Sequence, residues 1–336
     1  MTSVENNNPP SSDLEKLSRL YRAGNLASVE SFCGVLLAAY PDSALVSNVL
    51  GVALEGQGKL QDSLVAYEST TQKDPNHVDA YHNAAVLLGR LGRFEEARDK
   101  YGKIIELAPE DADAHNNLGV VLQNLNQHEL AVTHLQKAVV LHAGNASAFF
   151  NYANSLKELG ESDKALVNYD LSLKINPLFA KAHNNRGSLL EGAGRNEDAR
   201  RSYTEAIKLD SMYVAAYSNR GGVEKKLGNY VQAASDLGKA LELDPWKPAD
   251  SSEVSNFKFR LHVSLGDIQM YLGQYQKALE LYDSARAIEP DNIDVLAFKG
   301  NALAALGKLS EGLQLRQESF GFICFDVSKG VSLVRG

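Results

Sequence analysis

Residues 78–110 read VDAYHNAAVLLGRLGRFEEARDKYGKIIELAPE, with apolar residues at helical spacing on both sides of Gly92. This spacing predicts two helices joined by a tight turn, where a glycine takes positive φ without strain. The turn glycine recurs at multiples of 34 residues, as Gly24, Gly58, Gly92, Gly160, Gly194 and Gly228. A fixed period of this length is typical of a stacked repeat protein, whose function lies on an extended surface.

Further sets of residues keep the same phase. Small residues occupy the eighth place of each repeat, where they let two helices approach closely: Gly51, Ala85, Gly119, Ala153, Gly187, Gly221, Gly266 and Gly300. Alanine occupies the twentieth place, as Ala97, Ala131, Ala165, Ala199, Ala233 and Ala278. Tyrosine follows four places later as a wedge between neighbouring repeats, at Tyr67, Tyr101, Tyr169, Tyr203 and Tyr282. A proline stops the second helix, at Pro41, Pro75, Pro109, Pro177, Pro245 and Pro290.

These residues together resemble the tetratricopeptide repeat, and the resemblance covers about residues 10–319. It implies an all-α fold, a right-handed superhelical solenoid of about nine helix–turn–helix repeats whose first helices line a concave groove. The repeats begin near Pro10, Ala44, Val78, Ala112, Ala146, Ala180, Val214, Phe259 and Ile293. We expect residues 1–9 to form a disordered tail, 10–319 a single solenoid domain and 320–336 a C-terminal tail.

The pattern is interrupted by eleven additional residues, 248–258, which follow the only tryptophan, Trp246. One interpretation is a docking loop that exposes Trp246. The other, which we favour, is a first helix lengthened by about two turns, with Trp246 packed beneath it. The apolar stripe of this helix runs through Val254, Phe257, Leu261, Leu265, Ile268 and Leu272.

Three smaller departures also carry predictions. Asn126 replaces the turn glycine of the fourth repeat and, since asparagine tolerates the left-handed conformation, keeps the turn. Cys33 occupies a tyrosine place and is expected to be a buried, small hydrophobic residue. In the tail, residues 322–325 and 331–334 flank a turn-rich segment and predict a short β-hairpin. Because an isolated hairpin is marginal in water, it either caps the last helix, which we favour, or offers an edge to a partner.

Composition excludes several classes of function. The net charge is −8, from 34 basic and 42 acidic residues, which argues against a nucleic-acid-binding protein. No run approaches the ~20 apolar residues of a membrane-spanning helix, and the N-terminal residues do not form a secretory signal. With two cysteines there is no disulfide framework, so a reducing compartment is the default. We therefore expect a cytoplasmic protein without nucleic-acid or membrane partners.

The sixth place of five successive repeats is asparagine. The ladder comprises Asn83, Asn117, Asn151, Asn185 and Asn219, and the place before it includes His82, Asn116 and Asn184. This place faces the groove in the repeat family, so the spacing stacks five amides along the concave wall. A side-chain amide both donates and accepts, and can pair with the backbone of an extended peptide without reading its sequence. We predict these eight residues to bind peptide, against the alternative of a solvated polar groove.

The ladder is similar to the asparagine ladder in the repeat region of O-linked N-acetylglucosamine transferase, which holds peptide backbones. The similarity concerns the five asparagines only. Another mode of the repeat family, the carboxylate clamp of chaperone-binding modules, needs a lysine at the fifth place. No repeat has one: this place holds Asn48, His82, Asn116, Phe150, Asn184, Ser218, Val263 and Ala297.

Catalytic and cofactor motifs are not found in the sequence. His115 and His183 stand where other repeats have aromatic residues, which predicts packing, and His128 and His134 do not share a helical face. No nucleophile elbow or phosphate-binding glycine loop is present. We therefore predict no enzyme, no metal and no cofactor, and favour a scaffold that binds extended segments of partner proteins. The alternative is a substrate-recruiting or regulatory subunit of an enzyme system, such as a glycosyltransferase on another chain.

Overall fold

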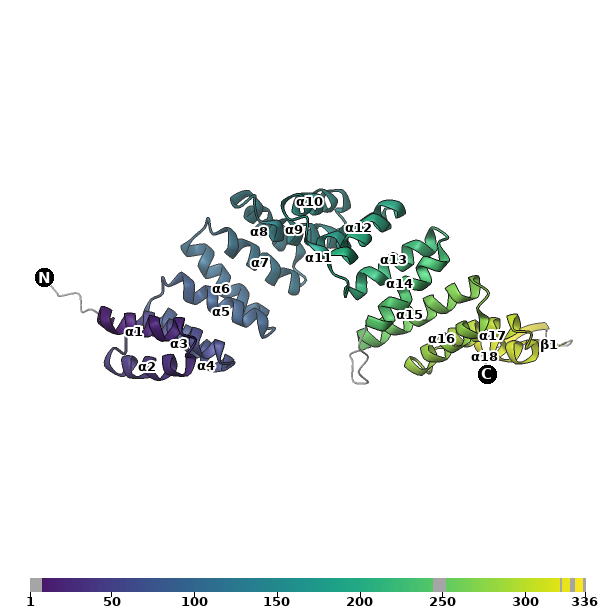
Figure 1. The fold of residues 1–336 in the computed structure, drawn as a ribbon, viewed down its shortest axis with the longest axis horizontal. Helices are drawn as coiled ribbons and strands as arrows, with labels where there is room; N and C mark the ends of the chain where they lie inside the picture. Colours follow the sequence, from purple (N-terminus) through teal and green to yellow (C-terminus); the bar gives the residue numbers. More distant parts are fainter. Residues whose placement is uncertain (1–7, 244–251, 321, 327–329, 335–336) are drawn as a thin grey trace. The chain divides into compact units, whose positions relative to one another are not determined.

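The structure is a computed structural model that describes residues 8–243, 252–320, 322–326 and 330–334. These residues form eighteen helices and two strands, and the helices follow one another as antiparallel pairs (Figure 1). The predicted all-α repeat solenoid is thereby confirmed. Contacts divide the chain into two compact units, Met1–Ile175 and Asn176–Gly336, and each contains whole helix pairs. Trp246 lies outside the described residues.

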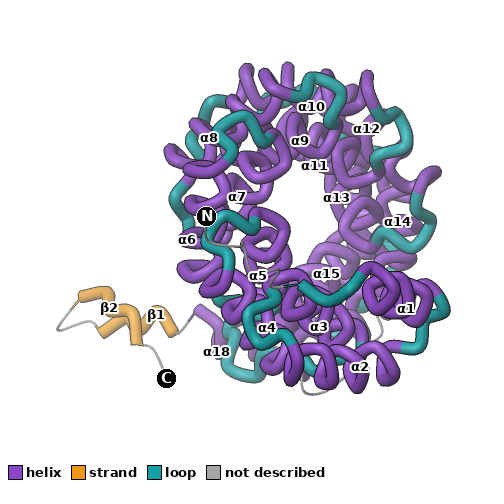
Figure 2. Tube along the Cα trace, turned by 90° about the vertical axis from the view of Figure 1, so that its left-hand side faces the viewer, coloured by secondary structure: helices purple, strands orange, loops and turns teal. Residues whose placement is uncertain are grey.

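The first compact unit holds five helix pairs. Its helices are α1 (Ser11–Arg22), α2 (Leu26–Ala39), α3 (Ala44–Gly56), α4 (Leu60–Lys73), α5 (Val78–Arg90), α6 (Phe94–Leu107), α7 (Ala112–Asn124), α8 (His128–Leu141), α9 (Ala146–Glu158) and α10 (Ser162–Ile175). Figure 2 shows the first helices α5, α7 and α9 on one side of this unit and the second helices α6, α8 and α10 on the other. We call the side formed by the odd-numbered helices the first-helix face.

The second compact unit holds four helix pairs and a hairpin. Its helices are α11 (Ala180–Gly192), α12 (Asn196–Leu209), α13 (Val214–Lys226), α14 (Tyr230–Leu243), α15 (Ser252–Tyr271), α16 (Tyr275–Ile288), α17 (Asp294–Ala305) and α18 (Leu309–Phe320). Strands β1 (Phe322–Asp326) and β2 (Gly330–Val334) pair antiparallel. Helix α15 has 20 residues where the other first helices have 12 or 13, because residues 252–258 of the inserted segment extend it at its N-terminus. That the hairpin caps the solenoid stays a prediction.

The turns inside the helix pairs have the geometry that the glycine series predicts. Gly92 has φ 73°; its N–H donates to the carbonyl of Gly89, and the N–H of Arg93 reaches back to the carbonyl of Leu88. This pair of bonds satisfies helix carbonyls that would otherwise lack a partner. Asn126 has φ 56° and is the one non-glycine residue with positive φ in the described part of the chain, which confirms its role.

The cores are built from the phased small residues and tyrosines. Every alanine of the twentieth place is fully buried, and Tyr67, Tyr169, Tyr203 and Tyr282 are among the largest fully buried side chains. A β-carbon added at Gly51 would lie 2.5 Å from the ring of Tyr67, so the glycine makes room for the tyrosine of its own repeat. Tyr67 also packs with residues of the following repeat, as predicted for a wedge. Cys33 is fully buried, which confirms its expected packing role.

Candidate functional site

The five ladder asparagines lie in the middle of first helices and are half-buried. Asn83, Asn117 and Asn151 belong to the first compact unit, on α5, α7 and α9; Asn185 and Asn219 belong to the second, on α11 and α13. Places two, six and nine of each repeat lie on one side of the first helix. Place six is four residues after place two, about one helical turn, and place nine is seven residues after it, about two turns. Each of these five repeats thus adds one amide to this stripe.

In the first compact unit, the amides are hydrogen-bonded from repeat to repeat. Each ladder asparagine donates from Nδ2 to the fifth-place residue of the preceding repeat. The bonds are Asn83 to Asn48 Oδ1 at 3.4 Å, Asn117 to His82 Nε2 at 3.4 Å and Asn151 to Asn116 Oδ1 at 3.0 Å. Because an amide nitrogen only donates, His82 accepts through Nε2. Two of the residues predicted to bind peptide, His82 and Asn116, therefore orient the next amide.

The second compact unit repeats this arrangement. Asn219 donates to Asn184 Oδ1 at 3.1 Å, and Asn184 donates to Asn185 Oδ1 at 3.3 Å. Asn184 is buried, with 7% of its surface exposed, so it holds its neighbours rather than facing a ligand. A hollow of about 160 Å³ adjoins Asn219 and is also lined by Lys225, Phe257 and Arg260.

A second set of bonds on the first-helix face was missed by the sequence reasoning. Glu55 Oε2 accepts from the hydroxyl of Tyr67 at 3.0 Å, and Glu55 Oε1 pairs with Arg90 of the next repeat at 2.5 Å. Glu191 does the same with Tyr203 at 3.0 Å and Lys226 at 2.7 Å. Burial and the carboxylate raise the pKa of Tyr203, which keeps its hydroxyl a donor. Both ion pairs join residues that are 35 apart, which is one repeat period of 34 plus one residue. This spacing between opposite charges is visible in the sequence and could have indicated the pairs.

A buried ion pair also escaped the sequence reasoning. Arg220 donates to both oxygens of Asp236 at 2.7 Å, and to Thr204 Oγ1 of the preceding helix pair at 3.2 Å. The Asp236 side chain is 2% exposed and that of Arg220 is 15% exposed. The bidentate bond raises the pKa of Arg220 further above its ordinary value. This contact ties α12, α13 and α14 together.

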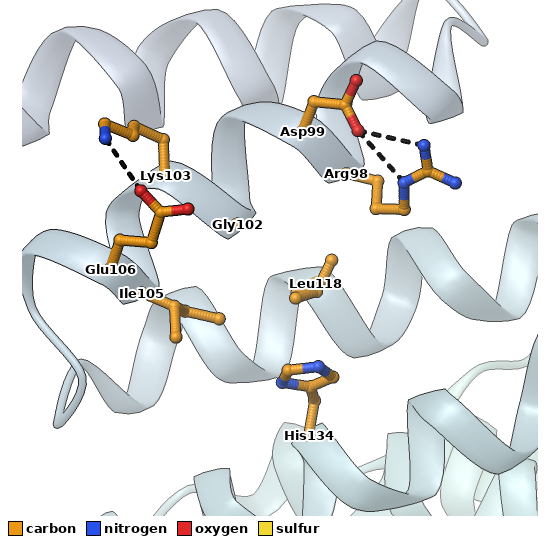
Figure 3. Close-up of a pocket in the computed structure, with 8 residues that line it drawn as sticks. All are labelled: Arg98, Asp99, Gly102, Lys103, Ile105, Glu106, Leu118 and His134. Atoms are coloured by element: carbon orange, nitrogen blue, oxygen red, sulfur yellow. Dashed lines mark hydrogen bonds and ion pairs between the residues drawn. The ribbon is translucent and has the colours of Figure 1, made fainter.

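A hollow of about 410 Å³ on the second-helix side lies beside a pair of histidines (Figure 3). The Nδ1 atoms of His115 and His134 are 3.0 Å apart, and His115 Nε2 lies 3.1 Å from the carbonyl of Pro109. Since a carbonyl only accepts, His115 is protonated at Nε2 and accepts at Nδ1 from His134. Figure 3 shows that the charged residues of the wall pair with each other, Arg98 with Asp99 and Lys103 with Glu106.

This histidine pair serves packing. His115 is buried, as predicted, and its contact with a proline carbonyl recurs at His183, whose Nε2 lies 3.0 Å from Pro177 O. Within the described residues, no three His, Cys, Asp or Glu side chains gather in a way that would hold a metal ion. Nor does any described helix combine the length and apolar character that crossing a membrane requires.

The histidine pair makes stability depend on pH. Burial, and to a lesser degree His115, lowers the pKa of His134 below its ordinary value of 6.5. The unfolded chain then takes up this proton at a higher pH than the folded one, so stability falls as pH drops below about 6.5. We expect Tm to fall more between pH 7 and pH 5 in the wild type than in His134→Gln, measured by thermal denaturation. Equal decreases in both proteins would contradict this assignment.

Comparisons with known proteins agree with the geometry. Three family models, each described as tetratricopeptide repeat, match residues 82–148 with 184–248, residues 270–317 and residues 146–177. No curated protein sequence matches the chain significantly. The repeat register and the helix pairs are thus supported by independent matches over most of the length.

The chain is similar to several solved structures. A tetratricopeptide repeat protein from Parabacteroides merdae is 21% identical, with a TM-score of 0.57 over 77% of this chain and 98% of that one. pilF of Pseudomonas aeruginosa is 18% identical, with a TM-score of 0.58 over 67% and 97%. YrrB, described as a TPR protein with an unusual peptide-binding site, is 24% identical, with a TM-score of 0.49 over 55% and 95%. From its repeat register, helix pairs and family matches, the chain belongs to the tetratricopeptide repeat proteins.

Proposed function

We propose that this chain is a protein–protein interaction scaffold, which binds an extended segment of a partner protein on the first-helix face through the asparagine ladder. The supporting observation is that four ladder amides donate to the preceding repeat, which fixes their orientation: Asn83, Asn117, Asn151 and Asn219. In Asn83 and Asn151, this bond uses one of two amide hydrogens, so a second donor and the oxygen acceptor stay available. Tetratricopeptide repeat proteins in general bind other proteins.

The expected affinity is the sum of modest contributions. A hydrogen bond between an amide and a peptide backbone contributes about 0.5–1.5 kcal/mol after exchange with water. Because the amides are already held in place, little side-chain entropy is lost on binding. Backbone contacts are independent of sequence, so selectivity between partners depends on the side-chain surfaces beside the ladder. Such a scaffold therefore recognises mainly the extended conformation of a peptide, and to a lesser degree its sequence.

The ladder is tested by removing the three amides of the first compact unit. We expect Asn83→Ala, Asn117→Ala and Asn151→Ala together to weaken binding about a hundredfold, since three lost bonds of about 1 kcal/mol each amount to about 3 kcal/mol. The ligands are peptides selected on the wild-type protein from a display library of random twelve-residue sequences. Affinities of the synthetic peptides are measured by fluorescence anisotropy.

The control separates binding from stability, because the same substitutions remove bonds between repeats. Asn168→Ala is the matched variant, since Asn168 lies on the second helix α10 and bonds only its own helix, through Lys164 O. It should keep wild-type affinity. Thermal denaturation of the triple variant shows whether the repeats stay folded at the assay temperature. A folded triple variant with unchanged affinity would reject the ladder as the binding element.

The alternative function, recruitment of substrates to an enzyme on another chain, uses the same peptide-binding face and adds a catalytic partner. No contact among the described residues favours it over a scaffold. The cytoplasmic location expected from the sequence likewise stays a prediction.

A further inference from the structure

An apolar hollow of about 250 Å³ opens on the first-helix face between α1 and α3. Its lining consists of Leu14, Leu17, Ser18, Tyr21, Leu45 and Val49. Tyr21 is 45% exposed and Leu45 is 39% exposed, although their side chains border the hollow. A concave apolar surface that stays open to water is a favourable place for an apolar side chain of a ligand.

The hollow shares helix α3 with the first bond of the asparagine ladder. Val49 occupies the sixth place of the second repeat, the place that Asn83 occupies in the third. Asn83 donates to Asn48, the residue next to Val49, so the first amide of the ladder is bonded to the helix that forms one wall of the hollow. A peptide whose backbone pairs with the amides therefore carries its next residues across the hollow.

Apolar and acidic side chains flank the same amides. The ninth place of three successive repeats is valine, Val52, Val86 and Val120, and Val86 is 37% exposed. The second place holds Asp79 on α5 and Asp113 on α7. Both aspartates are exposed, and neither forms an ion pair within the described residues. The face thus presents an apolar hollow at one end and two unpaired carboxylates further along.

We propose that the first compact unit selects partner segments that place one bulky apolar side chain in the hollow and a lysine or arginine against Asp79 or Asp113. This proposal rests on the proposed function, since the ladder holds the backbone. Neighbouring first helices lie roughly 10 Å apart and an extended chain advances about 3.3 Å per residue, so one repeat spans about three residues. We call the apolar residue in the hollow the anchor. A basic residue of the peptide that pairs with Asp79 is then about four or five residues from the anchor, and one that pairs with Asp113 is about three residues further away.

The peptides selected from the random twelve-residue library on the full chain test this pattern. They should share an apolar residue and a basic residue at one of these spacings, in either chain direction. Replacing the anchor of a selected peptide by alanine should weaken binding about tenfold to hundredfold, which corresponds to burial of one large apolar side chain. Asp79→Asn with Asp113→Asn should remove the preference for the basic residue and the dependence of affinity on salt.

Ser18→Phe tests the hollow from the protein side. Ser18 is exposed on the wall, so the ring fills the hollow without burying a charge. Ser18→Phe should bind the peptide that carries the anchor as weakly as the wild type binds the peptide with alanine at the anchor position. For the alanine peptide, Ser18→Phe and the wild type should have equal affinity. Ser31→Phe, the same change at an exposed serine of α2, should bind like the wild type. Leu45→Ala, which only shortens a side chain of the lining, should weaken binding of the anchored peptide severalfold and serves if Ser18→Phe is unfolded.

The possible outcomes separate the two proposals. Peptides that need the ladder asparagines but lack the anchor, or whose affinity does not change in Ser18→Phe or Leu45→Ala, would overturn the hollow and leave the scaffold standing. Peptides that bind regardless of the ladder asparagines would overturn the proposed function. A library that yields no bound peptide would count against both.

Discussion

Asp236→Ala is expected to lower the free energy of unfolding of the second compact unit by about 3 kcal/mol. The substitution leaves the Arg220 guanidinium without the two bonds of 2.7 Å that now neutralise it. An uncompensated buried charge costs about 3–5 kcal/mol, and the lower end applies because the Arg220 side chain is 15% exposed and turns partly toward water. Gln232, which donates to Asp236 at 2.9 Å, loses its partner as well.

Hydrogen exchange is the appropriate measurement, because a repeat array does not unfold as one two-state unit. The amides of α13 and α14 should exchange about a hundredfold faster in Asp236→Ala than in the wild type. Lys239→Ala is the matched control: it removes an exposed ion pair with Glu242 on the same helix and should change stability by less than about 1 kcal/mol. Unaltered protection in Asp236→Ala would mean that the ion pair does not join these helices.

The double variant Arg220→Leu with Asp236→Ala separates charge from packing. The second repeat has Leu50 and Ala66 at the places that Arg220 and Asp236 occupy, so the chain itself shows that an apolar pair fits there. Replacing both partners of a buried ion pair with apolar residues is often neutral or stabilising. The double variant should therefore recover most of the protection lost in Asp236→Ala. Failure to recover would assign the loss to packing instead of to the unpaired charge.

The repeat fold was predictable because its signals depend on backbone geometry, which each repeat restates. Gly92 and Asn126 both needed positive φ, and both have it. The alanines of the twentieth place were predictable for the same reason, since close helix contact admits only small side chains. The residues around Trp246 break the period and have no equivalent in the other repeats. Their packing therefore could not be predicted by comparison with a neighbouring repeat.

The polar contacts were harder to predict, since they depend on side-chain rotamers. The 34-residue spacing places Asn83 and Asn151 on one face but does not reveal their bonds to Asn48 and Asn116. The same holds for Glu55 with Arg90, at the same separation of 35 residues. In these pairs, a residue at one place of a repeat contacts the residue one place further along in the following repeat. Whether the ladder binds peptide stays a prediction, because bonds within the ladder do not by themselves identify a ligand.

Gly187→Ala should destabilise the second compact unit by about 1–3 kcal/mol, although alanine is the better helix former by about 1 kcal/mol. A β-carbon at residue 187 would lie 2.6 Å from the ring of Tyr203, so the ring must move. That movement breaks the bond of 3.0 Å from the Tyr203 hydroxyl to Glu191 and weakens the pairing of Glu191 with Lys226. Urea denaturation followed by circular dichroism, with hydrogen exchange of α11 and α12, measures the loss.

Gly222→Ala, at the ninth place of the seventh repeat, is expected to have the opposite effect on stability. Gly222 lies in the middle of the first helix α13, and a β-carbon there meets nothing within 4 Å. Since only helix propensity changes, the variant should be more stable by about 0.5–1 kcal/mol. The third repeat indicates that the loss of stability in Gly187→Ala is limited, because it has Ala85 at the eighth place together with Tyr101. That repeat has Gly89 at the place of Glu191, so its tyrosine has no carboxylate there to reach. Glycine at the eighth place is thus required where the tyrosine must reach a carboxylate, and equal stability changes in Gly187→Ala and Gly222→Ala would disprove that requirement.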